Sequence, residues 1–410
     1  YNFNLMTNFL VHIMNCNILH CTATQPNFDN QNTLQYPCLY GDESKESFLI
    51  DSIDNPEVFD RVEYYSLLGE DFNVVLNTKD IIDHIKAQLK HEMSALVVLN
   101  TKRAVSNLYN GLKNDREIQD WGWEIVYLTT NQCPKHRLEI IQDMKERLAE
   151  LRKGNHQKKL ICVSTKLVEA GVDIDFDLVY RSLAGIDSII QCGGRCNREG
   201  KKISKGRLYI LEYEDENLSY LPDLQKQRIA AKAALRMLKR EDIAGNKVNI
   251  EKACDYYFEK LYANENAAGR YLEFPINNED TILNLMTTNP NGINNYQIKT
   301  GNKPNFILSQ SFKTAATNFD LIKEDAISVI VQYNNDELIE QLYNAIECNN
   351  YYEIKTNLKK LQPYTVQIRR VNEYENYISK EMEGQILILS REAYDQNIGL
   401  TKGDLELLVY

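Results

Sequence analysis

The chain has 410 residues, of which 43% are hydrophobic and 26% are charged, as in an ordinary folded protein of two or three domains. This composition excludes an intrinsically disordered protein, and no apolar run is long enough to predict a membrane-spanning segment. The net charge of -11 excludes a protein that coats nucleic acid through a general positive field, so any contact with nucleic acid must be local.

The first stretch, residues 1–21, has no initiating methionine and no basic leader, and it mixes Asn and His with its apolar residues. A helix-like segment followed directly by the short apolar run "NILHC" is typical of the interior of a domain. We therefore expect that an upstream part of the protein is missing and that residues 1–45 are the end of an earlier domain.

Residues 46–245 alternate short apolar runs with amphipathic segments, which predicts βαβ units and a parallel sheet with flanking helices. The predicted fold class is therefore α/β. One predicted helix carries five apolar residues on a single face, namely Leu138, Ile141, Met144, Leu148 and Leu151. The predicted strands are 95–100, 123–130, 159–165, 178–182 and 206–213, and the predicted helices are 102–113, 135–153 and 223–240.

The remaining residues divide into a connecting segment and a small domain. Residues 246–310 are predicted to be a helical and loop linker, in which the Asn-rich part, 287–305, forms a long loop. Residues 311–410 combine the apolar runs "AISVIVQY", "YTVQIRR" and "GQILILS" with the helical pattern "DELIEQLYNAIE". This combination predicts a small accessory α+β domain.

Nine cysteines, an odd number, are scattered without the paired short spacings of a zinc site. Cys192 and Cys196 lie four apart, but no second pair and no histidine cluster supports a metal ion there. We expect reduced cysteines in a cytoplasmic protein, and we predict no metal ligands.

The segment "IIQCGGRCNREG", 189–200, places Arg195 and Arg198 three positions apart, behind two glycines and close to Gln191. In a parallel α/β domain, ligands bind where strand carboxyl ends meet helix N-termini. Two guanidinium groups at such an edge suit phosphoryl transfer. Each is planar and can donate two hydrogen bonds to the phosphate oxygens, over which the negative charge is spread. A solvated basic helix end explains the same residues, and both readings stay open at this point.

The segment upstream, "VSTKLVEAGVDIDFD", ends a strand in Ser164 and Thr165, whose small hydroxyls suit contacts with a phosphodiester backbone. Gly171 and Asp173 then form a predicted tight turn, whose carboxylate could accept from a sugar hydroxyl. The surrounding region, Leu151 to Arg207, has 12 Lys or Arg against 6 Asp or Glu, so a local positive surface is expected in an acidic chain. A solvated charged face is the alternative.

The continuous stretch 163–200 resembles motifs V and VI of superfamily 2 helicases. In its details, "VEAGVDIDF" and the pattern Q-x-x-G-R-x-N-R-E-G are similar to the CRISPR-associated helicase-nuclease of type I systems. The run "ILHCTATQP", 18–26, resembles motif III of that family, and 97–112 and 128–148 resemble the motifs that open its second lobe. The resemblance implies a second RecA-like lobe in 46–245 and a remnant of the first lobe in 1–45.

The resemblance also implies roles for single residues. Arg195 and Arg198 would be arginine fingers toward ATP, Gln191 would fix their geometry, and Gly171 and Asp173 would lie on the nucleotide side. Single-stranded DNA would run along Thr101, Thr130, Ser164 and Thr165, and Thr22 and Thr24 would couple lobe closure to strand movement. Capping of the next helix is the alternative for Thr101 and Thr130.

Two departures from the family pattern limit what this chain can do alone. No G-x-x-x-x-G-K-[ST] phosphate loop and no D-E-x-H-like magnesium motif occur in the 410 residues, and the His-Asp nuclease motifs are absent as well. The resemblance implies that ATP with Mg²⁺ is bound mainly by a first lobe upstream. We therefore expect this chain alone neither to hydrolyse ATP efficiently nor to cut DNA.

The resemblance implies an ATP-dependent translocase that acts on single-stranded DNA delivered by an RNA-guided surveillance complex, without a membrane partner. Two other classes of function remain open on the sequence. One is a different superfamily 2 translocase that acts on DNA or RNA, and the other is a non-catalytic module that keeps only the lobe fold.

Overall fold

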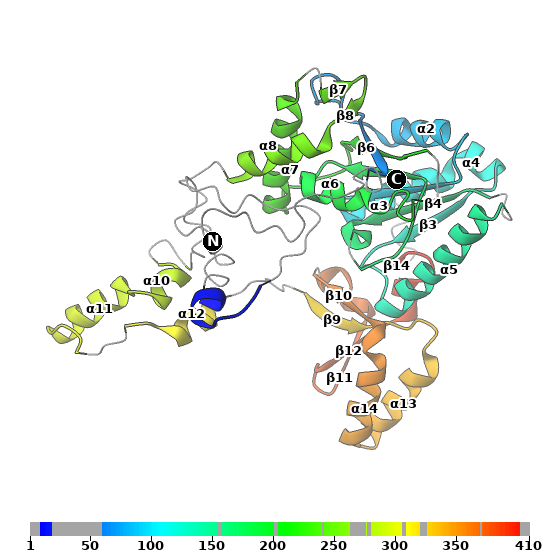
Figure 1. Ribbon diagram of the computed structural model, residues 1–410. Helices are drawn as coiled ribbons and strands as arrows, with labels where there is room; N and C mark the ends of the chain where they lie inside the picture. Colours follow the sequence, from blue (N-terminus) through cyan, green and yellow to red (C-terminus); the bar gives the residue numbers. More distant parts are fainter. Residues whose placement is uncertain are drawn as a thin grey trace. The chain divides into compact units, whose positions relative to one another are not determined.

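The computed structural model describes residues 9–18, 60–154, 158–169, 171–200, 204–239, 242–262, 276, 280–305, 309–319, 326–369 and 371–401. The chain forms two compact units (Figure 1). One unit contains residues 54–254 and 325–410, and the other contains residues 1–53 and 255–324. Each unit is described here by itself.

The larger unit is built on an eight-stranded sheet in the order β3-β4-β2-β5-β6-β1-β8-β7. The six strands from β3 to β1 are parallel to their neighbours, and β8 and β7 add an antiparallel edge. This arrangement confirms the predicted parallel α/β fold. The strands are β1 Val62–Ser66, β2 Ser94–Leu99, β3 Glu124–Leu128, β4 Leu160–Thr165, β5 Leu178–Ser182, β6 Gly206–Leu211, β7 Ile243–Ala244 and β8 Lys247–Val248.

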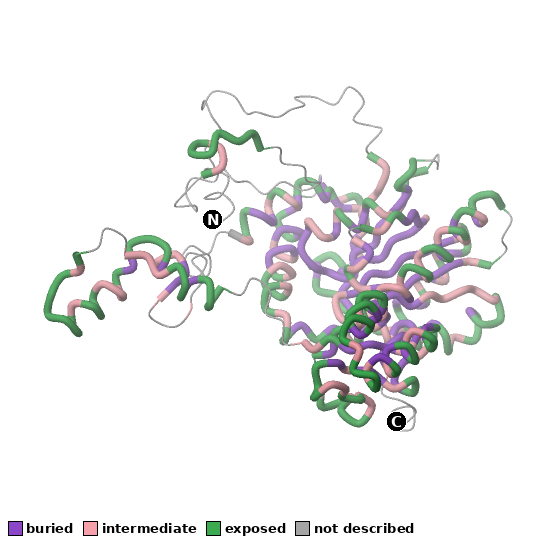
Figure 2. The backbone as a smooth tube through the Cα atoms, turned by 90° about the horizontal axis from the view of Figure 1, so that it is seen from below, coloured by how far each residue is buried: buried purple, intermediate pink, exposed green. Residues whose placement is uncertain are grey.

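Side chains alternate between the two faces along each strand, so apolar side chains point to both faces of this sheet. Helices cover both faces and bury them. Val97 and Tyr180 lie in the core beneath α2 and α3, whereas Arg181, one residue further, faces the side where α6 lies. Buried residues follow the strands, and exposed residues gather on the outer surfaces of the helices (Figure 2). The helices are α2 Thr78–Gln88, α3 Lys102–Asn114, α4 Arg116–Asp120, α5 Pro134–Arg152, α6 Ile186–Gly193 and α7 Pro222–Met237. A further helix, α8 Ile250–Tyr262, begins in this unit and continues into the smaller one.

Local sequence explains where two helices begin. Asn77 and Asp80 form a capping box at the start of α2, in which each side chain accepts a hydrogen bond from the backbone N–H of the other. The Thr101 hydroxyl accepts from the backbone N–H of Ala104 and so caps α3. These caps fix the points at which α2 and α3 leave the edge of the sheet.

The small accessory domain predicted near the C-terminus contains a four-stranded sheet in the order β10-β9-β12-β11. One face of this sheet packs on α13 and α14, and the other faces a cluster that includes Cys133 at the start of α5. The elements are β9 Ile327–Ile330, α13 Asp336–Glu347, α14 Tyr351–Leu361, β10 Thr365–Ile368, β11 Ile378–Glu381 and β12 Ile386–Leu389. The α+β prediction is confirmed.

This domain is attached to the large sheet through the turn before α5. The Tyr394 hydroxyl lies 2.9 Å from both the Cys133 backbone nitrogen and His136 Nδ1, and Tyr333 stacks on His136 with ring centroids 4.2 Å apart. The β13–β14 hairpin, Tyr394–Asp395 and Gly399–Leu400, adds a bond from the Leu400 N–H to the Asn131 carbonyl at 2.9 Å. Since His136 is buried, its pKa falls to about 4, and it stays neutral in this contact.

Two details of the sequence prediction are wrong. Leu138 is 64% exposed, because α5 turns only Met144, Leu148 and Leu151 fully inward, while buried His136 occupies its first turn. The Asn-rich part predicted as a loop contains helix α11, Pro290–Thr300. Asn289 in the left-handed conformation caps that helix by accepting from the Gly292 N–H.

The smaller unit carries, in its described residues, a short helical turn at Phe9–Ile13 and helices α10 Ile282–Met286, α11 and α12 Phe312–Asn318. Thr22 and Thr24, predicted to couple lobe closure to strand movement, lie outside the described residues. None of the helices in the described part is both long and apolar enough to cross a membrane.

The β13–β14 hairpin offers a test of the domain attachment. Gly399 has a φ of +79°, and a Cβ there would collide with the Asn131 carbonyl oxygen, whereas Gly384 has a φ of +84° with nothing within 4 Å. We expect Gly384→Ala to cost about 1–2 kcal/mol of backbone strain, and Gly399→Ala to cost a further 1–3 kcal/mol or so from overpacking. Chemical denaturation of the two variants measures the difference. Equal losses would contradict the hairpin contact.

Candidate functional site

The candidate residues lie where the parallel strands end. Leu99 pairs with Thr165 and Leu128 pairs with Ser164, so the loops after β2, β3 and β4 leave the same edge of the sheet. At this edge Thr130 is exposed, and Thr101 and Thr165 are half-buried. The structure therefore brings these three threonines to one edge, as parallel strands require.

Ser164 differs from the three threonines. It is fully buried, and its hydroxyl donates to the carbonyl of Leu128 at 2.7 Å. Ser164 therefore ties β4 to the end of β3 and does not line the surface, contrary to the sequence prediction. The alternation of side chains along β4 explains the difference, because Thr165 is the residue that turns outward.

Arg195 and Arg198 lie in the loop that follows α6, which ends at Gly193. The Arg195 guanidinium donates from Nε to the Val168 carbonyl at 2.8 Å and from Nη2 to the Glu169 carbonyl at 2.7 Å. Both acceptors belong to the segment after β4, so this backbone holds Arg195 without neutralising it. The Arg195 pKa lies below its usual range, because the side chain is partly buried and the Arg198 charge is nearby.

Arg198 is more exposed and has an ionic partner. Its Nε lies 3.1 Å from Oδ1 of Asp173, whose side chain is 72% exposed. Gly171 precedes this aspartate with a φ of +73° and open space around it, so backbone conformation and not packing favours glycine there. The predicted turn thus brings Asp173 to the second arginine.

Asp175, which the sequence analysis did not single out, anchors the arginine loop. Its buried carboxylate accepts from the backbone N–H groups of Arg198 at 2.8 Å and Glu199 at 3.1 Å, and it pairs with Arg152 at 2.6 Å. Next to it, the Phe176 N–H donates to the Arg195 carbonyl at 2.9 Å. The alternating D-x-D-x-D pattern at 173–177 is the feature of the sequence that could have identified Asp175.

Gln191 differs from its predicted role, and Gly193 packs against β1. The Gln191 side chain is exposed, and in the described structure it makes no hydrogen bond to Arg195 or Arg198. A Cβ on Gly193 would collide with the Tyr64 hydroxyl, so that glycine makes room for a side chain of β1.

A buried ionic network lies behind the arginine loop. Arg181 on β5 pairs with Glu169 at 2.9 Å and donates to the Ser188 hydroxyl at 2.8 Å and to the Asn100 side chain at 2.8 Å. Asn100 in turn donates to Glu216, which is buried and whose pKa is raised by that burial. No sequence pattern in the earlier analysis pointed to this network.

Three basic side chains, from the large sheet's helices and from the accessory domain, are near enough to interact electrostatically. Burial, followed by the charges of Arg369 and Arg137, lowers the pKa of Lys102 to about 8. Lys102 opens α3, Arg137 lies on α5 and Arg369 follows β10. In the described part of the chain, none of the three has a carboxylate within 4.0 Å, so the cluster is a local positive site.

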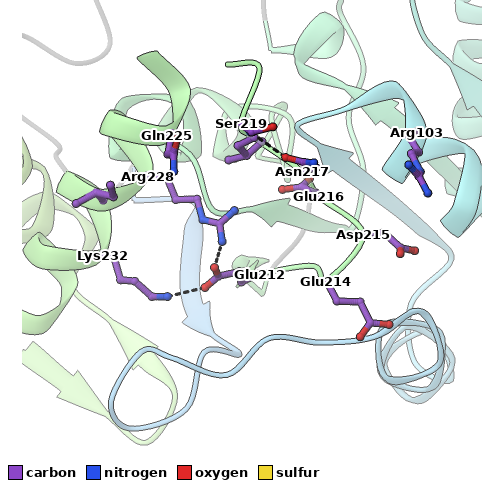
Figure 3. Close-up of a pocket in the computed structure, with 12 residues that line it drawn as sticks. Arg103, Glu212, Glu214, Asp215, Glu216, Asn217, Ser219, Gln225, Arg228 and Lys232 are labelled. Carbon is purple, nitrogen blue, oxygen red and sulfur yellow. Dashed lines mark hydrogen bonds and ion pairs between the residues drawn. The ribbon is translucent and has the colours of Figure 1, made fainter. Parts of the chain in front are cut away.

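A cavity of about 670 Å³ lies after β6 and beside α7 (Figure 3). Its carboxylates outnumber its cations, and Glu212 pairs with two of those cations, Arg228 and Lys232. This charge balance does not suit a triphosphate. The charged residues that line the cavity are Glu212, Glu214, Asp215, Glu216, Arg103, Arg228 and Lys232.

No three His, Cys, Asp or Glu side chains come together as a metal site in the ranges that the structure covers.

Comparisons with known proteins bear on this site. Residues 91–201 match the family model described as CRISPR-associated nuclease/helicase Cas3, C-terminal. The CRISPR-associated nuclease/helicase Cas3 of Haloferax volcanii is 35% identical over 135 residues, which are 32% of this chain and 13% of that protein. Its counterpart from Methanothermobacter thermautotrophicus is 31% identical over 128 residues, 31% of this chain and 14% of that protein.

The fold has a counterpart among solved structures. The crystal structure of T. fusca Cas3 aligns with a TM-score of 0.50 and 14% identity, over 84% of this chain and 41% of that one. The chain therefore spans well under half the length of the relatives it matches. These findings confirm the predicted resemblance to the C-terminal part of the Cas3 helicase-nuclease and the RecA-like fold of the large sheet.

The anchoring role of Asp175 can be tested by hydrogen exchange. Asp175→Ala leaves two backbone N–H groups without their acceptor and removes one of the partners of Arg152, at a cost of about 1–3 kcal/mol to the stability of the loop. We expect the amides of Arg198 and Glu199 to exchange roughly 10–100-fold faster. Asp173→Ala, two residues away, removes only an exposed side-chain pair and is the matched control. Unchanged exchange in Asp175→Ala would contradict the anchor.

Proposed function

We propose that this chain, which is similar to the C-terminal part of Cas3, is the second-lobe portion of an ATP-dependent translocase for single-stranded DNA in CRISPR interference. In this proposal it supplies two guanidiniums to a nucleotide bound mainly on another wall, together with part of the DNA track. The adjacent placement of Arg195 and Arg198 is the observation that carries the proposal.

The chemistry of the two arginines supports an encounter with phosphate. Arg195 is held by neutral carbonyls, so its positive charge is not cancelled. The Arg198–Asp173 pair is exposed, and such a pair contributes only about 0–1 kcal/mol. A γ-phosphate, with more negative charge than Asp173, can therefore take over Arg198. The forks of both side chains would then stabilise the charge that develops during phosphoryl transfer.

The other ligands of ATP are not supplied by the residues described here. When bound, Mg²⁺ would supply neutralisation of part of the phosphate charge. The motif for that ion belongs to the first lobe of the family. The contribution of this chain is to bind and orient the terminal phosphate from the opposite side.

The exposed edge next to the arginines fits the DNA strand. Thr101, Thr130 and Thr165 lie along the strand ends, and the basic cluster of Lys102, Arg137 and Arg369 adds positive charge. Contacts with phosphates hold a strand in place regardless of base sequence, as translocation requires. We leave buried Ser164 out of this track. The accessory domain contributes Arg369, so it forms one side of the track.

The proposed cycle of lobe closure and opening follows from a nucleotide site that is formed by two lobes together. ATP contacted by both lobes favours their closed arrangement, and hydrolysis removes that preference. An RNA-guided surveillance complex would deliver the DNA in the cytoplasm, in antiviral defence. These last points rest on the resemblance to Cas3 alone.

Replacing each finger tests the proposal in the complete enzyme that carries this chain. We expect Arg195→Ala and Arg198→Ala each to lower the kcat of DNA-stimulated ATP hydrolysis by about 10³-fold, because the arginines act in the transition state. Arg116→Ala, an exposed arginine on α4, is the control and keeps wild-type kcat. Unchanged hydrolysis in both finger variants would favour a non-catalytic binding module.

The basic cluster predicts a pH dependence of DNA binding. Because the Lys102 pKa is about 8, this lysine loses its charge as pH rises from roughly 7 to roughly 9, and DNA affinity should fall over that range. Lys102→Arg keeps the charge and should flatten the dependence. Fluorescence anisotropy with a labelled oligonucleotide measures the affinity. Lys113→Arg, at the exposed end of α3, is the control, and a flat wild-type profile would contradict the role of Lys102.

A further inference from the structure

Arg181 is the largest fully buried side chain in the described part of the chain, with 1% exposure. Its Nε has no hydrogen-bond partner, although the rest of the guanidinium is occupied. A buried ion pair is weak support for stability, since an apolar residue of similar size often serves as well. The position at the centre of β5 therefore calls for an explanation other than core packing.

Arg181 is linked through Glu169 to Arg195, the residue proposed to contact the nucleotide. Its Nη2 reaches the Glu169 carboxylate at 2.9 Å, and the Ser188 hydroxyl on α6 donates to the same carboxylate at 2.8 Å. The main-chain carbonyl of Glu169 accepts from Arg195 at 2.7 Å. Glu169 is thus fixed by its side chain and holds the first arginine finger by its backbone.

Arg181 is also linked through Asn100 to Thr101, the residue proposed to contact DNA. Nη1 of Arg181 donates to the Asn100 side-chain oxygen at 2.8 Å and to the Ser182 carbonyl at 2.9 Å. Asn100 directly precedes Thr101 and is also tied to Glu216, through its backbone N–H at 2.6 Å and its side chain at 2.8 Å. One guanidinium therefore joins the segment that holds Arg195 to the strand end that carries Thr101.

We propose that Arg181 is a positioning residue that fixes the Arg195 guanidinium relative to the DNA-contacting end of β2. This inference rests on the proposed function, because Arg181 would act only through Arg195 and the end of β2. It assigns to Arg181 no contact with ATP or DNA. Loss of the fork would let the Val168–Glu169 carbonyls shift, and a misplacement of about 1 Å can cost about 10²-fold in rate.

A double-mutant cycle in the complete enzyme tests the proposal. Arg181→Met keeps the length of the side chain and removes the fork. We expect it to lower kcat roughly 10–100-fold and to leave the KM for ATP within about threefold, since the lost interaction acts in the transition state. In the Arg195→Ala background the same change should cost less than about threefold, because Arg181 acts through Arg195. Equal losses in the two backgrounds would overturn the proposal.

Two further variants keep the test decisive if Arg181→Met folds poorly. Glu169→Gln retains hydrogen bonding without the charge, and Ser188→Ala removes only the link to α6. Both should lower kcat in the wild-type background and have little effect beside Arg195→Ala. Val105→Ala, a core change under the opposite face of the sheet, is the control for general destabilisation and should keep kcat.

The outcomes separate this inference from the proposed function. If Arg195→Ala itself leaves hydrolysis unchanged, the finger assignment fails. If Arg195→Ala abolishes hydrolysis while Arg181→Met, Glu169→Gln and Ser188→Ala all match wild type, only the positioning role of Arg181 fails.

Discussion

The Asp175 carboxylate is the interaction on which the candidate site depends. It accepts from two consecutive backbone N–H groups in the arginine loop and pairs with Arg152 from α5. A loop of this kind would otherwise expose its N–H groups to water and move freely. Because the carboxylate is buried just before β5, it holds the loop in a fixed position relative to that strand. The guanidiniums of Arg195 and Arg198 are thereby placed by the sheet.

The sequence predicted the elements that local patterns encode and missed those that tertiary contacts decide. Short apolar runs located β2 to β6, and the spacing of Gly171 and Asp173 located the turn beside the arginines. Burial of Ser164 and the role of Asp175 depend on which neighbouring strand lies opposite, which no local pattern states. Arg181 was hidden for the same reason, since a charged residue in an apolar run gives no hint of its partners.

The accessory domain is fixed to the large sheet by contacts that leave little freedom. Tyr394 and Tyr333 enclose neutral His136, and the β13–β14 hairpin lies on the turn that carries Thr130. The same turn ends β3 at the edge where the strand track is proposed. A domain held at this point keeps Arg369 near enough to Lys102 for its charge to lower the lysine pKa.

Charge distribution links the two proposed sites. The chain as a whole is acidic, yet Arg195 lies near Arg198, and Lys102 lies near Arg137 and Arg369. Burial first, and then the neighbouring positive charges, lower the pKa values of Arg195 and Lys102. Folding holds these charges together at a cost in repulsion, which Asp173 and Glu169 reduce at Arg195. A phosphate at either group removes that repulsion, so binding free energy is available at both places. In the proposed function, the acidic remainder of the chain would favour anionic ligands at these two groups over the rest of the surface.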